Sequence, residues 1–273
     1  LFHSSLIRYL SKHFQSPEID RIQKFSNGQS NPTYLIHLSH RRSSGDEKLV
    51  LRKQPDGLLL KGAHNVVREG KLMKYLREVN PFIPLPTIHF IEEDRGYIGT
   101  QFFIMDFVEG TIYRSACLDT IDQANSKSMI YCGMAQVLAN IHNTSISSLE
   151  GIFGKVKVKS VEEANRRQVH IWKQQYSKSC VSIHMEPLPE MQELGSWLEK
   201  TMPCSSTTAF LTLVHGDFRL DNMIFNQNSE VIAVLDWELS SIGANLADLA
   251  YCCLGYYLPS IGFLKDFSVL SKD

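Results

Sequence analysis

The sequence lacks the marks of several protein classes. Its 28 lysines and arginines stand against 29 acidic residues, which gives a net charge of −1 over 273 residues. The clear basic excess of a general nucleic-acid-binding protein is therefore absent. No stretch reaches the roughly 18 uninterrupted apolar residues of a membrane-spanning helix. The longest uncharged run, residues 249–264, contains two glycines and a proline, and it predicts a buried segment interrupted by turns. We expect no transmembrane segment and no nucleic-acid partner.

Cysteine is present but forms no metal or redox pattern. The six cysteines make no C-x-x-C pair and no cysteine–histidine cluster with the spacing of a zinc site. This distribution favours reduced thiols in an intracellular compartment over a disulfide framework. The sequence begins with Leu1 rather than Met, which leaves room for a targeting peptide ahead of it. Internal repeats are also missing, so the length predicts one large domain or two small ones.

The first hundred residues predict strands around one helix. Residues 33–38 and 48–52 are short runs rich in β-forming residues, and the polar segment Arg41–Glu47 between them predicts a long exposed loop. A short run at Tyr97–Gly99 and an apolar strand at residues 102–105 come later. Apolar side chains at helical spacing over residues 65–79 predict an amphipathic helix, which the following prolines end. Its apolar stripe consists of Val66, Leu72, Met73, Leu76 and Val79.

Beyond Gly110, helical periodicity replaces the strand pattern. Residues 126–142 carry apolar side chains at helical spacing, and residues 191–202 predict a second helix. We therefore expect a boundary near Gly110, between a β-rich N-lobe of residues 1–109 and a helical C-lobe of residues 110–273. The predicted fold class is α+β.

The segment that carries chemistry runs from residue 211 to residue 248. An apolar strand at residues 211–214 leads into His-Gly-Asp-Phe-Arg-Leu-Asp-Asn at residues 215–222, and a predicted hairpin follows at residues 223–235. Because antiparallel pairing brings the two open ends of a hairpin together, Asn222 and Asp236 should lie close in space. An amide oxygen and a carboxylate are hard ligands that suit Mg²⁺. Asp217, five residues before Asn222, could accept a proton from a hydroxyl that attacks a metal-bound phosphate.

This spacing, H-x-D-x-x-x-x-N followed by an aspartate after a hairpin, is the arrangement of the kinase catalytic loop and its metal-binding aspartate. His-Gly-Asp at residues 215–217 and Leu-Asp-Trp-Glu at residues 235–238 make the sequence resemble the aminoglycoside phosphotransferase (choline kinase-like) family. With Gly-Gln-Ser-Asn-Pro-Thr-Tyr at residues 28–34 and Val-Leu-Arg-Lys at residues 50–53, it is similar to one branch of that family. This branch is the kinase-like domain fused ahead of acyl-CoA dehydrogenase domains in family members 10 and 11. The resemblance implies a two-lobed protein-kinase-like fold, whose C-lobe usually extends past residue 273.

The resemblance also implies a nucleotide site between the lobes. Residues 26–31 take the place of the phosphate-covering loop, Arg52 that of the strand lysine that holds the α- and β-phosphates, and Glu69 that of its ion-pair partner. Lys53 should point to the opposite face of the strand, and a guanidinium is a broader group than the usual ammonium. The hinge whose backbone would bind adenine falls at residues 106–108. The implied nucleotide-binding residues are Ser26, Asn27, Gly28, Gln29, Ser30, Asn31, Arg52, Glu69, Met105, Asp106 and Val108.

Several residues around Asp217 leave alternatives open. His215 is a candidate catalytic residue, although orienting the loop suits it better than proton transfer. Arg219, a further catalytic candidate, could pair with substrate or with a neighbouring carboxylate. Asp221 could face the site or form a loop-stabilising salt bridge. Asp248 fits an N-terminal cap or a loop anchor better than a metal ligand.

Together these features predict an ATP- and Mg²⁺-dependent phosphotransferase acting on a small-molecule hydroxyl, with Asp217 as base and with Asn222 and Asp236 as metal ligands. In the branch that the sequence resembles, the implied acceptor is a hydroxyacyl-CoA in fatty-acid catabolism, phosphorylated so that the group can later be eliminated. The resemblance further implies fusion to, or association with, an acyl-CoA dehydrogenase domain, and a mitochondrial or peroxisomal location. Two alternatives remain: a catalytically idle nucleotide-binding module of a larger dehydrogenase, and a kinase for aminoglycosides or choline.

Overall fold

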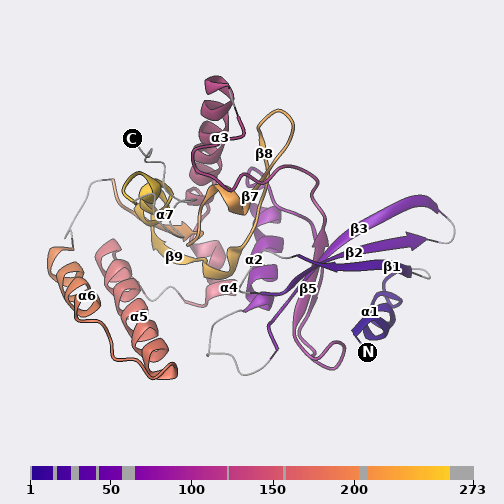
Figure 1. Cartoon of the computed structure of the whole chain (residues 1–273), viewed down its shortest axis with the longest axis horizontal. Coiled ribbons are helices and arrows are strands. Elements are labelled where there is room, and N and C mark those ends of the chain that lie inside the picture. Colours follow the sequence, from indigo (N-terminus) through magenta and orange to yellow (C-terminus); the bar gives the residue numbers. More distant parts are fainter. Residues whose placement is uncertain are drawn as a thin grey trace.

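An antiparallel sheet with a helix on each face makes up the N-terminal part of the chain, up to Asp106 (Figure 1). The computed structural model describes residues 2–14, 17–25, 31–40, 43–56, 65–121, 123–155, 158–202 and 208–258. In these ranges the sheet has five strands in the order β1-β2-β3-β5-β4. They are β1 (Pro17–Lys24), β2 (Thr33–His40), β3 (Ser43–Lys53), β4 (Ile88–Glu92) and β5 (Phe102–Asp106). Helix α1 (Phe2–Leu10) covers one face and helix α2 (Val66–Val79) the other.

Alternation along β3 decides which side chains meet each helix. Leu49 and Leu51 belong to the apolar cluster that contains α1, whereas Val50 belongs to the cluster that contains α2. Because successive side chains of a strand point to opposite faces, Arg52 follows Val50 toward α2 and Lys53 follows Leu51. The pleat of β3 thus aims Arg52, and not Lys53, at the inner face of the sheet.

Helix α2 begins and ends where the sequence predicts. The Asn65 side chain accepts a hydrogen bond from the Arg68 amide at 2.9 Å, which makes Asn65 the N-cap. The helix ends at Val79, just before the first of the prolines. Val79 is 44% exposed, so its predicted place on the buried stripe is wrong. The rest of the stripe is buried, namely Val66, Leu72, Met73 and Leu76.

Helices and two short strand pairs follow residue 110. The helices are α3 (Ala124–His142), α4 (Glu150–Phe153), α5 (Val161–Ser182), α6 (Pro189–Thr201) and α7 (Asn245–Cys253), with short 3₁₀ turns η1 (Ser147–Leu149), η2 (Leu220–Asn222), η3 (Trp237–Leu239) and η4 (Leu254–Tyr256). Strand β6 (Leu211–Val214) pairs with β9 (Ser241–Ala244), and β7 (Met223–Phe225) pairs with β8 (Val231–Val234), both antiparallel. The predicted α+β class is confirmed.

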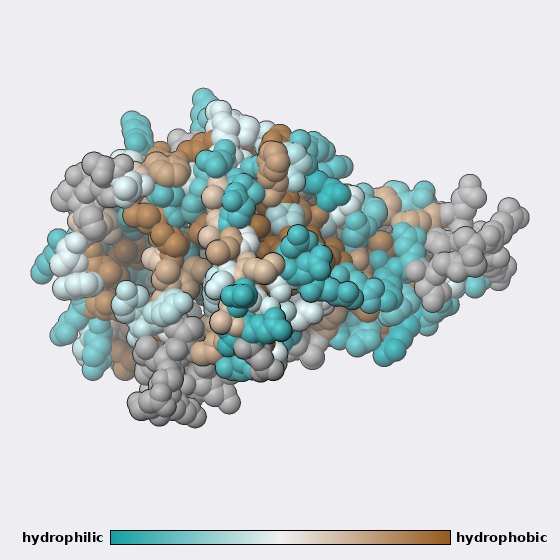
Figure 2. All heavy atoms as spheres, turned by 90° about the horizontal axis from the view of Figure 1, so that it is seen from above, coloured by the Kyte–Doolittle hydropathy of each residue, from teal (hydrophilic) through white to brown (hydrophobic). Residues whose placement is uncertain are grey.

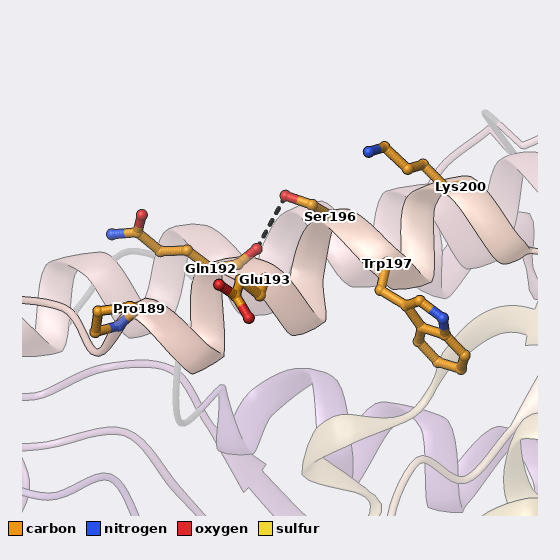
Figure 3. A pocket seen from close by; sticks show the side chains of 6 residues that line it. All are labelled: Pro189, Gln192, Glu193, Ser196, Trp197 and Lys200. Atoms are coloured by element: carbon orange, nitrogen blue, oxygen red, sulfur yellow. Dashed lines mark hydrogen bonds between the residues drawn. The ribbon is translucent and has the colours of Figure 1, made fainter.

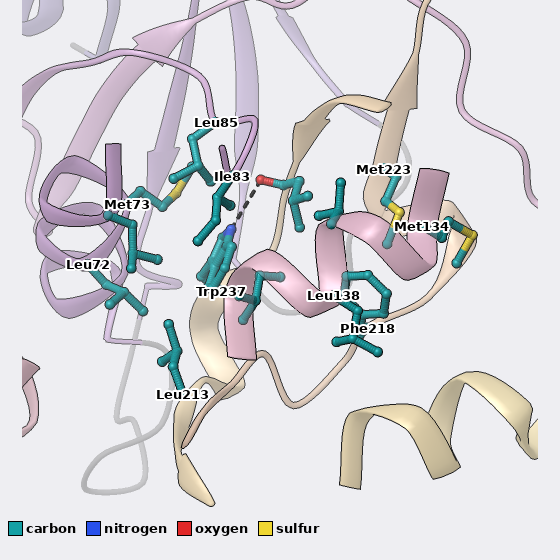
Figure 4. Packing of buried hydrophobic residues seen from close by; sticks show 14 of the residues in the cluster. Leu72, Met73, Ile83, Leu85, Met134, Leu138, Leu213, Phe218, Met223 and Trp237 are labelled. Atoms are coloured by element: carbon teal, nitrogen blue, oxygen red, sulfur yellow. Dashed lines mark hydrogen bonds between the residues drawn. The ribbon is translucent and has the colours of Figure 1, made fainter. Parts of the chain in front are cut away.

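One apolar cluster joins the sheet to the helices that follow it (Figure 4). It unites Leu72 and Met73 of α2 with Leu138 of α3 and Phe218 of the loop before β7. Trp237 lies within it, fully buried, and its indole nitrogen donates to the backbone oxygen of Val234 at 3.1 Å. The residue that follows Asp236 is therefore fixed in the core, which holds the end of the β7–β8 hairpin against the sheet.

The local structure differs from the sequence-based expectations in several places. Residues 43–47 are the first part of β3 instead of an exposed loop, because they pair with the end of β2. Strand β4 was not expected, and the Tyr97–Gly99 run is a turn. Helix α1 was also not expected. The segment from residue 249 is not buried as far as the structure describes it, since Tyr257 is 81% exposed.

Polar and apolar side chains are mixed on the face shown in Figure 2. Trp172 of α5 is 49% exposed and Trp197 of α6 is 59% exposed, so both helices present part of their surface to solvent. Among the residues that the structure describes, no helix combines the length and the apolar character needed to cross a membrane.

Candidate active site

The β7–β8 hairpin brings Asn222 and Asp236 to the same end, as the sequence predicts. Met223 pairs with Val234, and the Leu235 amide donates to the backbone oxygen of Asn222 at 2.9 Å. Asp236 comes next and adopts a left-handed backbone, with φ 65° and ψ 56°. A non-glycine residue in this region is strained, and such strain concentrates at functional sites. The hairpin thus places the backbone of Asn222 next to that of Asp236.

Asp217 is tied directly to Asn222. The Asn222 Nδ2 atom donates to the backbone oxygen of Asp217 and to its Oδ2 atom, both at 2.9 Å. Since the Nδ2 atom faces Asp217 and both partners on Asp217 are acceptors, the Oδ1 atom of Asn222 is the one left for another ligand. The Asn222 side chain thus closes the loop of residues 217–222, and it links the candidate base to the candidate metal ligands.

His215 is completely buried beneath this loop. Its Nε2 atom lies 3.0 Å from the backbone oxygen of Leu235, and its Nδ1 atom accepts from the Asp217 amide at 3.3 Å. A carbonyl only accepts, so Nε2 carries the hydrogen and the ring is neutral. Burial lowers the pKa of His215, although Asp248 opposes this shift. From this position the ring holds Asp217 against the hairpin but does not reach the surface.

Asp248 anchors the first residues of the same loop. Its carboxylate accepts from the amides of His215 and Gly216, both at 2.8 Å, and its side chain is 1% exposed. His142, at the end of α3, approaches the same carboxylate at 3.4 Å. Of the two roles considered for Asp248, these contacts fit the loop anchor.

Arg219 and Asp221 form a bidentate ion pair with each other. Both side chains are about a quarter exposed, and the pair lies beside Asp217. The Tyr251 hydroxyl of α7 contacts both Asp217 and Arg219, and burial together with the Asp217 charge raises the pKa of Tyr251. No sequence pattern pointed to Tyr251, which approaches Asp217 only because α7 packs against the loop.

Arg52 contacts three carboxylates at once. Its Nε atom donates to Glu69 Oε2 at 3.0 Å, while one terminal nitrogen donates to Asp236 Oδ1 at 2.5 Å. The same nitrogen lies 3.6 Å from Glu238 Oε2. Burial favours the neutral guanidinium, but Glu69, Asp236 and Glu238 together outweigh it and raise the pKa of Arg52. Burial raises the pKa of Glu69 to about 7, against the effect of Arg52. A planar guanidinium offers donors in fixed directions for such a multiple contact, whereas an ammonium group is a compact point charge.

The predicted hinge has part of its backbone already engaged. The Asp106 amide donates to the Thr87 oxygen at 3.0 Å, and the Phe107 amide donates to the Lys48 oxygen at 3.3 Å. Met105 is buried behind them and Val108 is half-buried. Of the predicted phosphate loop, residues 26–30 lie outside the described residues. Asn31 is described, and its side chain is buried against Glu238.

The donor set around Asn222 and Asp236 fits Mg²⁺. Among the described residues there is no cluster of three or more histidine, cysteine or acidic side chains that could cage an ion. Mg²⁺ does not require such a cage, because it is usually held by one or two protein carboxylates together with waters and substrate phosphates. The Oδ1 atom of Asn222 and the Asp236 carboxylate supply hard oxygen atoms of this kind.

Two surface hollows lie apart from this cluster. One, of about 470 Å³, is lined by Pro189, Gln192, Glu193, Ser196, Trp197 and Lys200 of α6 (Figure 3). The other, of about 400 Å³, lies between α3, the turn after α2 and the β7–β8 turn. Neither is lined by Asp217, Asn222 or Asp236, so neither marks the candidate site.

Comparison with known proteins identifies the family of the chain. The sequence profile of the phosphotransferase enzyme family matches residues 21–268. The chain is 43% identical to acyl-CoA dehydrogenase family member 10 of Mus musculus over 240 residues, covering 87% of the chain and 20% of that relative. It is 37% identical to family member 11 of Pongo abelii over 266 residues, covering 93% of the chain and 31% of the relative. The chain thus spans less than a third of the length of these relatives.

Solved structures share the fold. A structure from Ralstonia eutropha JMP134, assigned as an aminoglycoside phosphotransferase, has a TM-score of 0.71 and 26% identity, covering 98% of the chain and 76% of the other. A thermostable mutant of aminoglycoside phosphotransferase APH(4)-Ia, in a ternary complex with ADP and hygromycin B, has a TM-score of 0.58 and 16% identity, covering 92% and 77%. The predicted kinase-like fold is confirmed.

Proposed function

Because the chain belongs to the phosphotransferase enzyme family, we propose that it transfers the γ-phosphoryl group of ATP to a hydroxyl group of a small molecule. The observation that carries this proposal is the position of Asn222, whose side chain binds Asp217 and whose backbone is paired beside Asp236. A base for the attacking hydroxyl and a metal-binding pair are thereby joined in one cluster. A kinase active site requires both of these parts.

Asp217 acts on the acceptor. Its carboxylate orients the hydroxyl and takes its proton while the new bond between oxygen and the γ-phosphorus forms and the bond to ADP breaks. His215 is a positioning residue, since it is buried and holds Asp217 through the backbone. Arg219, paired with Asp221 beside Asp217, lies on the acceptor side of the cluster.

Arg52, Asn222 and Asp236 act on the nucleotide. Arg52, held by Glu69, binds the phosphates, and its broad guanidinium keeps contact with Asp236. Asn222 and Asp236 would hold Mg²⁺, which neutralises phosphate charge when it is bound. The adenine would bind the backbone of residues 106–108, through groups other than the engaged amides of Asp106 and Phe107. Residues 26–31 would cover the phosphates.

For the acceptor we favour a hydroxyacyl-CoA. Relatives at 43% and 37% identity are named acyl-CoA dehydrogenase family members 10 and 11, and the matched segment is one part of their longer chains. A kinase domain joined to such a dehydrogenase could phosphorylate a hydroxyl on the acyl chain that the other domain later handles. An aminoglycoside acceptor has weaker support, because the protein solved with hygromycin B is only 16% identical.

The test is a panel of acceptors incubated with ATP and Mg²⁺ and analysed by mass spectrometry. It includes hydroxyacyl-CoAs that differ in the position of the hydroxyl, together with choline and an aminoglycoside. We expect a phosphorylated hydroxyacyl-CoA with wild type and none with Asp217→Asn. If only choline or only the aminoglycoside is phosphorylated, that compound is the acceptor and the hydroxyacyl-CoA is not. No transfer to any acceptor, despite ATP binding, would favour the idle nucleotide-binding module.

A further inference from the structure

Glu238 connects two parts of the site that are far apart in sequence. The Nδ2 atom of Asn31 donates to Glu238 Oε2 at 2.7 Å, across 207 residues of sequence. Both partners are shielded from solvent, since Asn31 is 1% exposed and the Glu238 side chain 12%. A buried hydrogen bond to a carboxylate is among the stronger contacts a neutral side chain can make.

The same glutamate is held from the other side by two arginines. Its carboxylate lies 3.6 Å from the Arg52 nitrogen that binds Asp236, and its backbone oxygen accepts from Arg68 of α2 at 2.5 Å. The turn after Asp236 is thus attached to residues of the sheet and of α2. Glu238 itself stands between Asn31, at the end of the predicted phosphate loop, and Arg52, the predicted phosphate ligand.

The chemistry of the pair fixes the orientation of Asn31. An ionised carboxylate only accepts hydrogen bonds, so the amide nitrogen of Asn31 must face Glu238 and its Oδ1 atom must face away. That Oδ1 atom is buried and has no hydrogen-bond partner among the residues that the structure describes. The backbone around it is also fixed, because the Asn31 oxygen accepts from the Thr33 hydroxyl at 3.0 Å.

We propose that Glu238 is a positioning residue for the nucleotide, which fixes the end of the phosphate loop through Asn31 and steadies Arg52 on the metal-binding side. This inference rests on the proposed function. It differs from a role as a further metal ligand, because the contact that matters is the hydrogen bond to Asn31. Loss of either partner should therefore weaken nucleotide binding with or without Mg²⁺.

A double-mutant cycle on ADP and ATP affinity tests the proposal by calorimetry. We expect Asn31→Ala and Glu238→Ala each to weaken binding about tenfold, and the double variant to bind no worse than about the weaker single variant. Glu238→Gln keeps an acceptor for Asn31 and should retain most of the affinity that Glu238→Ala loses. If Glu238→Ala does not fold, the nucleotide affinities of Asn31→Ala and Glu238→Gln are each compared with that of wild type. In that case unchanged affinity for Asn31→Ala overturns the proposal.

The hairpin turn provides a matched control. Asn226 Nδ2 donates to Glu230 Oε2 at 2.7 Å, the same pair of groups on an exposed turn, so Glu230→Ala should leave nucleotide affinity unchanged. Additive effects of Asn31→Ala and Glu238→Ala overturn the proposal while nucleotide binding by wild type stands. Equal losses in Glu238→Gln and Glu238→Ala, seen only with Mg²⁺, make Glu238 a metal ligand instead. If wild type binds no nucleotide, the proposed function and this inference both fail.

Discussion

A Cβ atom added to Gly216 would lie 2.6 Å from the backbone oxygen of Leu239. Gly216 also has φ +86°, in the left-handed region that side chains avoid. Its amide donates to Asp248, so the loop cannot move away to make room without losing that anchor. The close approach of the turn after Asp236 to the catalytic loop explains why a glycine stands between His215 and Asp217.

We therefore expect Gly216→Ala to lower the free energy of unfolding by at least about 2 kcal/mol, the combined cost of backbone strain and the contact with Leu239. Gly99→Ala is the matched control. Gly99 has the same φ of +86°, and a Cβ there would meet no described atom within 4 Å. It should cost about 1 kcal/mol from backbone strain alone. Denaturant unfolding measures the stability of both variants. Equal losses of unfolding free energy in Gly216→Ala and Gly99→Ala would show that the contact with Leu239 adds nothing.

Asp217→Asn should lower kcat at least about a hundredfold, the usual scale for losing a general base. Asparagine still offers an oxygen to Asn222, so the loop should keep its shape. Nucleotide affinity should change little, because in the proposed function Asp217 acts on the acceptor. Steady-state turnover with the acceptor found in the screen measures kcat, and titration with ATP measures the nucleotide affinity. The exposed Asp94→Asn serves as control, and wild-type turnover in Asp217→Asn would remove Asp217 from the mechanism.

The hairpin, and with it the position of Asn222 next to Asp236, was predictable because its signals are local. A polar turn at residues 226–229 between two apolar runs fixes the β7–β8 pairing, and the pairing alone brings Asn222 to Asp236. The ladder confirms this part of the prediction. The alternation of side chains along β3 likewise follows from strand geometry, and it places the side chains of Arg52 and Lys53 on opposite faces of the sheet.

What the sequence did not reveal depends on distant partners. Residues 43–47 are polar and read as a loop, yet they form strand because β2 supplies their hydrogen bonds. The pair between Asn31 and Glu238 spans 207 residues, and no periodicity points from one to the other. Tyr251 reaches Asp217 only through the packing of α7.

Asp236→Asn should weaken nucleotide binding in the presence of Mg²⁺ far more than in its absence. The substitution keeps an oxygen for Arg52 but removes the negative charge that a hard cation requires. Calorimetric titration with ADP, with and without Mg²⁺, measures the difference. An equal loss in both conditions would indicate that Asp236 acts on the loop rather than on a metal.

Arg52→Lys should not be conservative. Lysine keeps the charge but lacks the Nε atom that donates to Glu69 while the terminal nitrogen donates to Asp236, so the buried Glu69 would lose part of its hydrogen bonding. We expect a loss of about 1–3 kcal/mol in unfolding free energy and weaker nucleotide binding. Arg166→Lys, in an exposed ion pair with Glu162, should change stability by less than about 0.5 kcal/mol. Full stability and affinity in Arg52→Lys would contradict the need for a guanidinium.

The buried neutral ring of His215 should make stability depend on pH. Burial lowers its pKa in the folded chain, whereas the unfolded chain titrates near the ordinary value of about 6.5. Below that pH the unfolded chain binds a proton that the folded chain does not, so the free energy of unfolding falls as the pH decreases. Glu69 acts the other way: its pKa is raised to about 7, so the folded chain holds the extra proton and its contribution falls as the pH increases.

The difference in unfolding free energy between wild type and His215→Gln separates the pH effect of His215 from that of Glu69, because both proteins contain Glu69. Glutamine can donate to the Leu235 oxygen but does not titrate, so the stability of wild type relative to this variant should fall from pH 7 to pH 5 by up to about 1.4 kcal/mol per pH unit. Urea unfolding at several pH values measures both proteins, and His170→Gln, on the exposed surface of α5, should follow wild type. A constant difference between wild type and His215→Gln across this range would mean that His215 takes up its proton as readily in the folded chain as in the unfolded one, and the neutral, loop-holding ring would have to be abandoned.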